Sequence, residues 1–211
     1  MLIQPVTVPG IFRMLAWKEL IWELPSVRQE IFLTFDDGPS PFLTREILAI
    51  LEAYDAQASF FCVGDNIRKY PRITEEIAGK GHAIGNHTFS HRNGWQTSLD
   101  EYLADVAACD IHAGSRLFRP PYGRLRREQA RLLARDHDII LWSVMSWDFH
   151  PRTSREQCLH NVLHYTESGS VVVFHDHDKA KDKMLFSLPR FLEHFSRQGY
   201  TFAAITEEKV R

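Results

Sequence analysis

Short runs of β-branched and aromatic residues alternate along this chain with longer amphipathic stretches. This alternation is typical of βα units, whose strands lie parallel in one sheet with helices over its faces. The fold class is therefore predicted to be α/β. We expect strands at 31–35, 58–63, 82–84, 117–119, 139–144, 170–175 and 201–205, and helices at 41–54, 71–79, 99–113, 126–136, 154–165 and 188–198.

Capping signals support the start of two of these helices. Pro41 suits the first helical position, and Ser40 suits the N-cap before it. Ser98 and Glu101 have the spacing of a capping box at the start of the helix at 99–113. We therefore place both helix starts at these residues.

Chemically active residues follow the expected strands at the point where each strand ends. Parallel barrels assemble their active sites at the carboxyl ends of their strands, so these positions favour a barrel with one catalytic face. An open doubly wound sheet is the alternative, but Gly38 alone after the first strand is not the glycine-rich phosphate loop of such a sheet. The residues concerned are Asp36, Asp37, His87, Arg119, Asp148 and His175.

Length and composition fit one catalytic domain. The 211 residues are enough for a single core and marginal for two, and 44% of them are apolar. We expect an N-terminal extension at 1–29 packed on a single domain at 30–211. A net charge of −2 argues against nucleic acid as a partner. No apolar run approaches the ~20 residues that span a bilayer, so we expect no transmembrane segment.

The N-terminus and the cysteines favour a cytoplasmic location. Pro5, Pro9 and Gly10 interrupt the first apolar stretch, which therefore does not have the pattern of a secretory signal. The cysteines are odd in number and far apart, so we expect buried thiols instead of disulfides. They are Cys62, Cys109 and Cys158.

Two histidines, His87 and His91, stand four residues apart in a polar segment that reads as a loop. A spacing of four also puts two rings on one face of a helical turn, where they can bind one ion. A second pair with this spacing, His160 and His164, has no acidic pair to accompany it. We expect the first pair to bind a metal and the second to be ordinary helix surface.

An acidic pair, Asp36 and Asp37, follows the expected strand at 31–35. A turn with a helix cap is the plain interpretation, because Asp, Gly, Pro and Ser are usual there. However, successive side chains after a strand point opposite ways, so one carboxylate can bind a metal while its neighbour stays free as a base. Given the two histidines, we favour a divalent-metal site with a spare base, which are parts needed to hydrolyse an amide or ester.

The segment at 117–123 places Arg119 before Pro120, Pro121 and Tyr122. Two prolines restrict the backbone around them, and a rigid loop is the structural interpretation. The same rigidity can hold a backbone N–H, such as that of Tyr122, towards a developing oxyanion. Arg119 is expected to bind a carboxylate bidentately and keep it ionised.

His175 ends an apolar strand, where a histidine is often an ordinary part of the core. Its unperturbed pKa near ~6.5 also makes it a natural proton donor to a leaving amine. Asp148 is the candidate partner that fixes its tautomer and holds it charged. The next residues, Asp176, His177 and Asp178, are predicted to form a solvated loop and not a second metal cluster.

Five segments in order resemble the polysaccharide deacetylase family, also called carbohydrate esterase family four. The family pattern is TFDDG, then H-[ST]-x-x-H, then R-x-P-[YF], then a segment with tryptophan and aspartate, then hydrophobic-x-His. Any one motif is weak, but all five in order are specific, and they cover the chain from residue 30 to its end. Here they are Thr34 to Gly38, His87 to His91, Arg119 to Tyr122, Trp142 to Phe149 and Val173 to His175.

The resemblance implies a distorted, incomplete TIM-like (β/α) barrel of about seven strands. It also implies one bound divalent metal ion, for which Zn²⁺ is the first choice, although cobalt, nickel or manganese also suits two histidines and an aspartate. The implied metal ligands are Asp37, His87 and His91. The other implied roles are Asp36 as base, Arg119 holding Asp36, Thr88 bracing the histidine loop, the Tyr122 amide after Pro121 facing the oxyanion, His175 as acid and Asp148 behind it.

The fourth segment departs from the family pattern. Family members often have aspartate at the position of Met145 and tryptophan at that of Phe149. Trp147 is an unusually bulky neighbour of Asp148. Trp147 either narrows the cleft and stacks on a sugar ring, or is a core or lid aromatic.

The activity implied is metal-dependent removal of N-acetyl groups from the amino sugars of a glycan or oligosaccharide, with release of acetate. Hydrolysis of an O-acetyl ester or of a small amide at the same metal is the alternative. A non-catalytic sugar-binding relative is a third reading, and the presence of both Asp36 and His175 argues against it, since binding needs neither a base nor an acid. The partner is then an acetylated carbohydrate. The sequence leaves its identity and the oligomeric state open.

Overall fold

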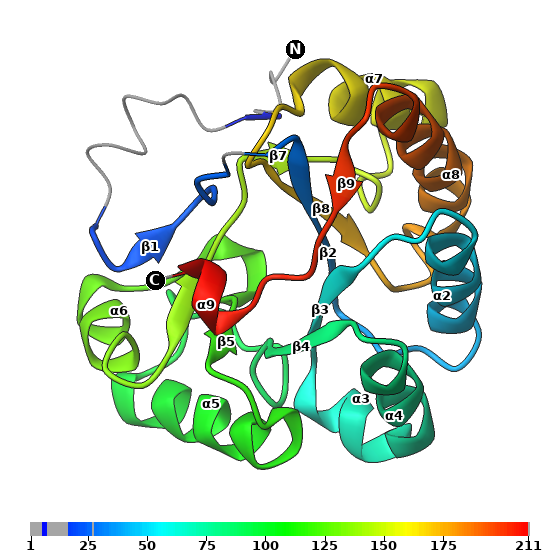
Figure 1. Cartoon of the computed structure of the whole chain (residues 1–211). Helices are drawn as coiled ribbons and strands as arrows, with labels where there is room; N and C mark the ends of the chain where they lie inside the picture. Colours follow the sequence, from blue (N-terminus) through cyan, green and yellow to red (C-terminus); the bar gives the residue numbers. More distant parts are fainter. Residues whose placement is uncertain (1–5, 8–16, 27, 211) are drawn as a thin grey trace.

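The fold was obtained as a computed structural model, which describes residues 6–7, 17–26 and 28–210. Strands occupy the centre and helices surround them, as the alternation predicts (Figure 1). The strands are β1 (Leu20–Ile21), β2 (Glu30–Asp36), β3 (Ala58–Cys62), β4 (Ala83–Asn86), β5 (Leu117–Phe118), β6 (Asp138–Ile140), β7 (Val144–Met145), β8 (Val171–His175) and β9 (Thr201–Phe202). The helices are α2 (Leu43–Ala53), α3 (Gly64–Lys69), α4 (Pro71–Gly79), α5 (Leu99–Ala113), α6 (Arg127–Leu133), α7 (Arg155–Tyr165), α8 (Lys181–Arg197) and α9 (Glu207–Val210), with a 3-10 turn, η1, at Pro121–Gly123.

The strands form one curled parallel sheet. Its order is β1-β6-β5-β4-β3-β2-β8-β7, and β9 pairs with β2. Only three residues, 141–143, connect β6 near one end of this order to β7 at the other. A connection of that length reaches about 14 Å, so the sheet must curl until its two ends approach. This is the incomplete barrel that was predicted.

The expected single strand at 139–144 is wrong in detail, because it is two strands, β6 and β7, near opposite ends of the strand order. The backbone N–H of Leu141 donates to Ile21 O at 2.7 Å, whereas that of Ser143 donates to Val171 O at 3.0 Å. The chain therefore changes partners within the run. The run is nevertheless apolar throughout, since Ile140, Leu141 and Val144 are all buried, and the pattern alone did not reveal the break.

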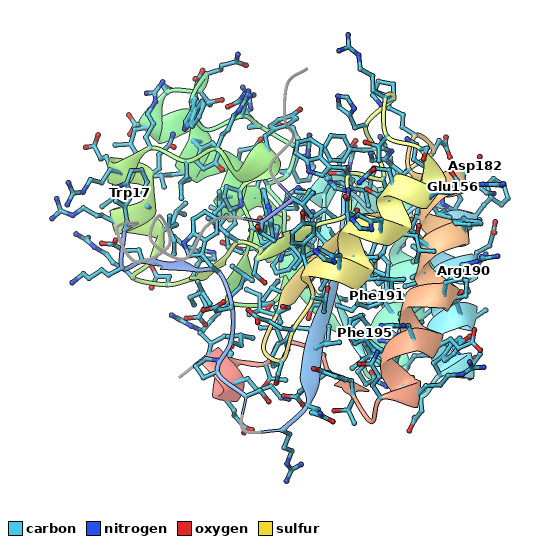
Figure 2. The ribbon with its side chains drawn as sticks, turned by 90° about the horizontal axis from the view of Figure 1, so that it is seen from above. Trp17, Glu156, Asp182, Arg190, Phe191 and Phe195 are labelled. Atoms are coloured by element: carbon cyan, nitrogen blue, oxygen red, sulfur yellow. The ribbon has the colours of Figure 1, made fainter. Side chains whose placement is uncertain are left out.

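The core lies on both faces of the central strands. Every residue of β2 after Glu30 is buried, as expected for a parallel strand that helices cover. Phe35 of β2 stacks on Phe60 of β3, with ring centroids 5.0 Å apart. Figure 2 shows Phe191 and Phe195 of α8 on the side of the helix that faces inward, and both are buried. The central strands are thus held in place by a continuous apolar layer.

Several predicted helix ends differ from the structure because a side chain finds another partner. Ser40 does not cap α2, which begins at Leu43; its hydroxyl donates instead to Asp176 at 3.0 Å. Ser98 is the N-cap of α5, but its hydroxyl donates to the Glu101 carboxylate at 2.7 Å, so the capping box does not form. The last long helix, α8, begins at Lys181 and not at 188, because buried Met184 stabilises additional helical residues at its N-terminal end.

The expected extension at 1–29 lies partly outside the described residues, which omit 1–5, 8–16 and 27. Within it, Thr7 bridges Val144, Glu23 bridges Ser170, and β1 pairs with β6. The division of the chain at residue 30 stays a prediction. In the described ranges, no helix is both long and apolar enough to cross a membrane.

Candidate metal centre and active site

The register of the sheet brings the candidate residues to one edge. Asp36, the last residue of β2, pairs with His175, the last residue of β8. On the other side of β2, strands β3, β4 and β5 follow in parallel pairing. His87 comes directly after β4 and Arg119 directly after β5. Residues from four distant parts of the sequence therefore meet at the carboxyl ends of the strands.

Three side chains converge as the predicted metal ligands. Asp37 Oδ1 lies 3.0 Å from His91 Nε2 and 3.5 Å from His87 Nε2. One ligand atom from each of the three residues lies within 4.8 Å of the others. A carboxylate oxygen and two imidazole nitrogens form a donor set that suits a divalent cation such as zinc.

The second ring nitrogen of His87 supports this assignment. His87 Nδ1 lies 2.7 Å from the carbonyl oxygen of Arg119. A carbonyl only accepts, so Nδ1 carries the proton and the lone pair of Nε2 faces Asp37. Metal-binding histidines commonly make this outer hydrogen bond, which fixes both the tautomer and the ring orientation. The residues present therefore fit a bound cation.

Asp37 is anionic, as a metal ligand must be. Burial raises the pKa of its carboxyl group, but the nearby side chains of His87 and His91 and the charge of His175 lower it by more than burial raises it. The net result is a pKa well below the ordinary value. The carboxylate is thus available to a cation over the whole physiological pH range.

The two histidines lie on a loop and not on a helical turn. Thr88 and His91 have positive φ angles, 60° and 56°, that a helix does not allow. Thr88 braces this loop as predicted, since its hydroxyl oxygen accepts the N–H of Arg92 at 3.0 Å. Its own N–H donates to the side chain of Asn86 at 2.7 Å. These bonds hold both rings towards Asp37.

Unusual backbone conformations gather at this edge of the sheet. Among the described non-glycine residues, six have positive φ, and five of them lie around the site. Each such conformation costs about 1–3 kcal/mol and persists only where the surrounding contacts impose it, which is commonly at functional sites. The five are Asp37, Thr88, His91, Tyr122 and Trp147.

The candidate base, Asp36, is buried against Arg119. Arg119 Nη1 donates to Asp36 Oδ1 at 2.6 Å and to Thr34 Oγ1 at 2.8 Å. The bidentate contact that the sequence predicted is wrong, because the remaining guanidinium nitrogens donate to the carbonyls of Ile140 and Leu141. Arg119 is fully buried, so its position is set by the whole sheet. It fixes one oxygen of Asp36 and leaves the other for a ligand.

The candidate acid, His175, is paired with Asp148. His175 Nδ1 lies 2.7 Å from Asp148 Oδ1, and the His175 backbone N–H donates to Asp148 Oδ2 at 2.8 Å. Burial lowers the pKa of His175, but the charge and hydrogen bond of Asp148, together with the charges of Asp37 and Asp36, outweigh it and raise the pKa to about 9. His175 is therefore an imidazolium at neutral pH, with Nε2 left to donate.

The predicted substrate contacts border these groups. Pro121 is buried, whereas Tyr122 is 59% exposed and its ring meets that of His91 edge-on, with centroids 4.8 Å apart. Trp147 is half-buried and lies 5.4 Å from the Phe149 ring, centroid to centroid. The ring of Phe149 in turn contacts that of His175, with centroids 4.6 Å apart. Trp147 thus belongs to an aromatic wall beside the acid and is not part of the interior core.

The prediction of a solvated loop after His175 is wrong for two of its three residues. Asp176 is 1% exposed, and only Asp178 is fully on the surface. Burial raises the pKa of Asp176 to about 6, against the effect of its hydrogen bonds. His177 Nε2 lies 3.3 Å from Asp37 Oδ2. The spacing of two between His175 and His177 could have predicted that His177 faces the site, because alternate residues of an extended chain face the same side.

The predictions of buried thiols and of a second histidine pair on the surface of a helix are confirmed. Cys62, Cys109 and Cys158 are free and buried. His160 and His164 stack on α7 with ring centroids 5.1 Å apart. Among the described residues, the three-ligand group at Asp37 is the only one found, and neither of these histidines belongs to it.

A curled parallel sheet that holds such a centre beside a buried carboxylate and a charged histidine defines an α/β metallohydrolase. The sequence profile of the family "Polysaccharide deacetylase" matches residues 25–141, more than half of the chain. The chain belongs to the polysaccharide deacetylase family. The resemblance drawn from the five motifs is thereby confirmed, and the barrel type is confirmed by the solved structure described next.

Individual relatives cover most of the chain. A peptidoglycan-N-acetylglucosamine deacetylase of Bacillus cereus is 31% identical over 201 residues, which is 88% of this chain and 91% of that protein. A chitooligosaccharide deacetylase of Azorhizobium caulinodans is 31% identical over 160 residues, covering 71% and 74%. The crystal structure of the Bc1960 peptidoglycan N-acetylglucosamine deacetylase superposes with a TM-score of 0.84 at 29% identity, covering 94% of this chain and 95% of that one.

Proposed function

We propose that this protein removes N-acetyl groups from the amino sugars of a glycan or oligosaccharide by metal-dependent hydrolysis, releasing acetate and a free amine. The observation that carries the proposal is the pairing of Asp36 with His175 across adjacent strands, directly beside the ligand Asp37. The base, the acid and the cation site are then close enough together to act on one acetyl carbonyl of a substrate. The names of the relatives support the same reaction.

The residues divide the chemistry between them. Asp37, His87 and His91 would hold a divalent cation, for which zinc is our first choice, and this cation would polarise the acetyl carbonyl and acidify the attacking water. Asp36 takes the proton of that water with the oxygen that Arg119 leaves free. The backbone N–H of Tyr122, positioned by Pro121, stabilises the developing oxyanion. Trp147 forms a wall against which a sugar ring packs.

His175 completes the reaction by donating its Nε2 proton to the leaving nitrogen. An amine departs only when it is protonated, whereas an ester oxygen is a better leaving group. The pKa of about 9 keeps His175 charged at neutral pH, so the site suits amide cleavage better than O-acetyl ester cleavage. Asp148 holds Nδ1 and so keeps the proton on Nε2 directed outward. A non-catalytic sugar-binding protein needs neither group.

The test is acetate release from N-acetylglucosamine oligomers, peptidoglycan and acetylated xylan, each with chelator and with restored zinc. We expect release from the N-acetylated substrates only, and only with the metal. Asp36→Asn should lose about 10²–10⁴-fold in rate while remaining folded. Asp136→Asn, the same change at an exposed position, is the matched control.

Two outcomes would replace this proposal. Acetate from xylan alone would assign the ester reaction. Sugar binding without chelator-sensitive release from any substrate would assign a binding protein.

The cytoplasmic location stays a prediction, and cell fractionation with an antibody to the protein tests it.

A further inference from the structure

The chain leaving β8 is fastened to the loop that carries the metal ligand. The N–H of Asp176 donates to the carbonyl of Asp36 at 2.8 Å. Its buried carboxylate accepts hydrogen bonds from the hydroxyls of Ser40 and Thr44. A Cβ at Gly38 would lie 2.3 Å from Asp176 Oδ2, so only glycine permits this approach. The residue after Asp176 is thereby held at a fixed place beside the site.

That residue is His177, and its tautomer follows from its neighbour. His177 Nδ1 accepts the backbone N–H of Lys179 at 3.0 Å. A backbone amide only donates, so Nδ1 bears the lone pair and the proton of the neutral ring sits on Nε2. Nε2 lies 3.3 Å from Asp37 Oδ2. The ring nitrogen that carries the proton is therefore the one nearest the carboxylate of the metal ligand.

The two oxygens of Asp37 have different surroundings. Oδ1 faces the Nε2 atoms of His91 and His87, at 3.0 and 3.5 Å. Oδ2 faces His177 instead. His177 is outside the group of donor atoms that lie within 4.8 Å of one another. This arrangement separates a ligand oxygen from an outer oxygen, and it places His177 on the outer one.

We propose that His177 is a positioning residue of the metal centre, donating from Nε2 to Asp37 Oδ2 and so keeping Oδ1 directed at the cation with His87 and His91. The inference rests on the metal centre of the proposed function. A distance of 3.3 Å is slightly longer than an ordinary N–H···O bond, and a small rotation of either side chain closes it. Outer partners of this kind typically change metal affinity by about 10- to 100-fold.

The experiment measures zinc affinity by competition with a chromophoric chelator, without any substrate. His177→Phe keeps a ring of similar size and removes both nitrogens, so its affinity should fall about 10- to 100-fold. His177→Gln places an amide N–H near the position of Nε2 and should keep most of the affinity. His164→Phe, the same change on the exposed surface of α7, is the matched control and should leave it unchanged.

A second readout separates positioning from direct ligation. The visible spectrum of the Co²⁺ form reports the number and type of ligands. Both the wild type and His177→Gln should give the same spectrum. Unchanged zinc affinity in His177→Phe would refute the proposal. Low zinc affinity in His177→Gln together with a changed Co²⁺ spectrum would also refute it, because this result would show that His177 is a fourth ligand. If zinc binding depends on His177 but no acetate is released, the proposed function fails while this inference stands.

Discussion

Replacing Asp148 by asparagine tests the assignment of the acid most directly. The change keeps the size of the side chain and an oxygen that can accept the Nδ1 proton of His175, but it removes the charge 2.7 Å away. That charge is what raises the pKa of His175 against the effect of burial. Without it, the pKa of His175 should fall towards its ordinary value of ~6.5, because burial is then opposed only by the hydrogen bond and by the more distant charges of Asp37 and Asp36.

The size of the effect follows from the two pKa values. With a pKa of about 9, nearly all of His175 is protonated at pH 7. At the ordinary pKa of ~6.5, about a quarter is protonated. A full return to that value should therefore lower activity at pH 7 by about fourfold through loss of the charged form alone. The alkaline limb of the profile should move towards lower pH, because the acid now loses its proton earlier.

The assay is kcat/KM for acetate release as a function of pH, with zinc-loaded wild type and Asp148→Asn. This parameter reports the ionisations of the free enzyme. Both proteins carry the same cation, so the displacement between the two profiles is the measured quantity. Asp136→Asn is the control for the loss of one carboxylate, and thermal melts check the fold. Superimposable alkaline limbs would refute the role of Asp148, and a lower rate without displacement would indicate a purely structural effect.

Two further predictions concern stability. Arg119→Met removes the partner of buried Asp36 and should lower the free energy of unfolding by about 3–5 kcal/mol, measured by urea titration. Arg190→Met, on the exposed face of α8, is the control and should change the free energy of unfolding little. Equal unfolding midpoints for the two variants would contradict a stabilising role of the buried pair. Zinc at a free concentration about 100 times its Kd should stabilise the wild type by about 2.7 kcal/mol. Asp37→Ala should abolish most of that gain, and an equal gain in the variant would place the cation elsewhere.

Much of the fold could be predicted from the sequence because the signals for its helices and strands are local. The helices predicted at 71–79 and 99–113 have the same bounds as α4 and α5. Their apolar residues recur at helical spacing, and Pro71 marks one start. Strands 31–35, 58–63 and 170–175 were found because parallel strands buried on both faces are continuous apolar runs. In each case the sequence signal lies within the element itself.

Contacts between distant segments explain the errors. The split between β6 and β7 depends on which strands flank residues 141–143, and nothing in that apolar run records its neighbours. Ser40 looked like a helix cap until Asp176 offered it a different partner. Arg119 was expected to grip Asp36 with two nitrogens, but the carbonyls of β6 and the residue after it take the others.

The amino-acid sequence by itself determined the family and the order of most elements, and it predicted the metal ligands, the base and the acid. These depend on residue types at short, fixed spacings. The tertiary structure alone decided that Asp36 stands opposite His175 and that His177 faces the outer oxygen of Asp37. Pairing between strands far apart in the chain sets both relationships, because register is a property of two segments together and neither one encodes it alone.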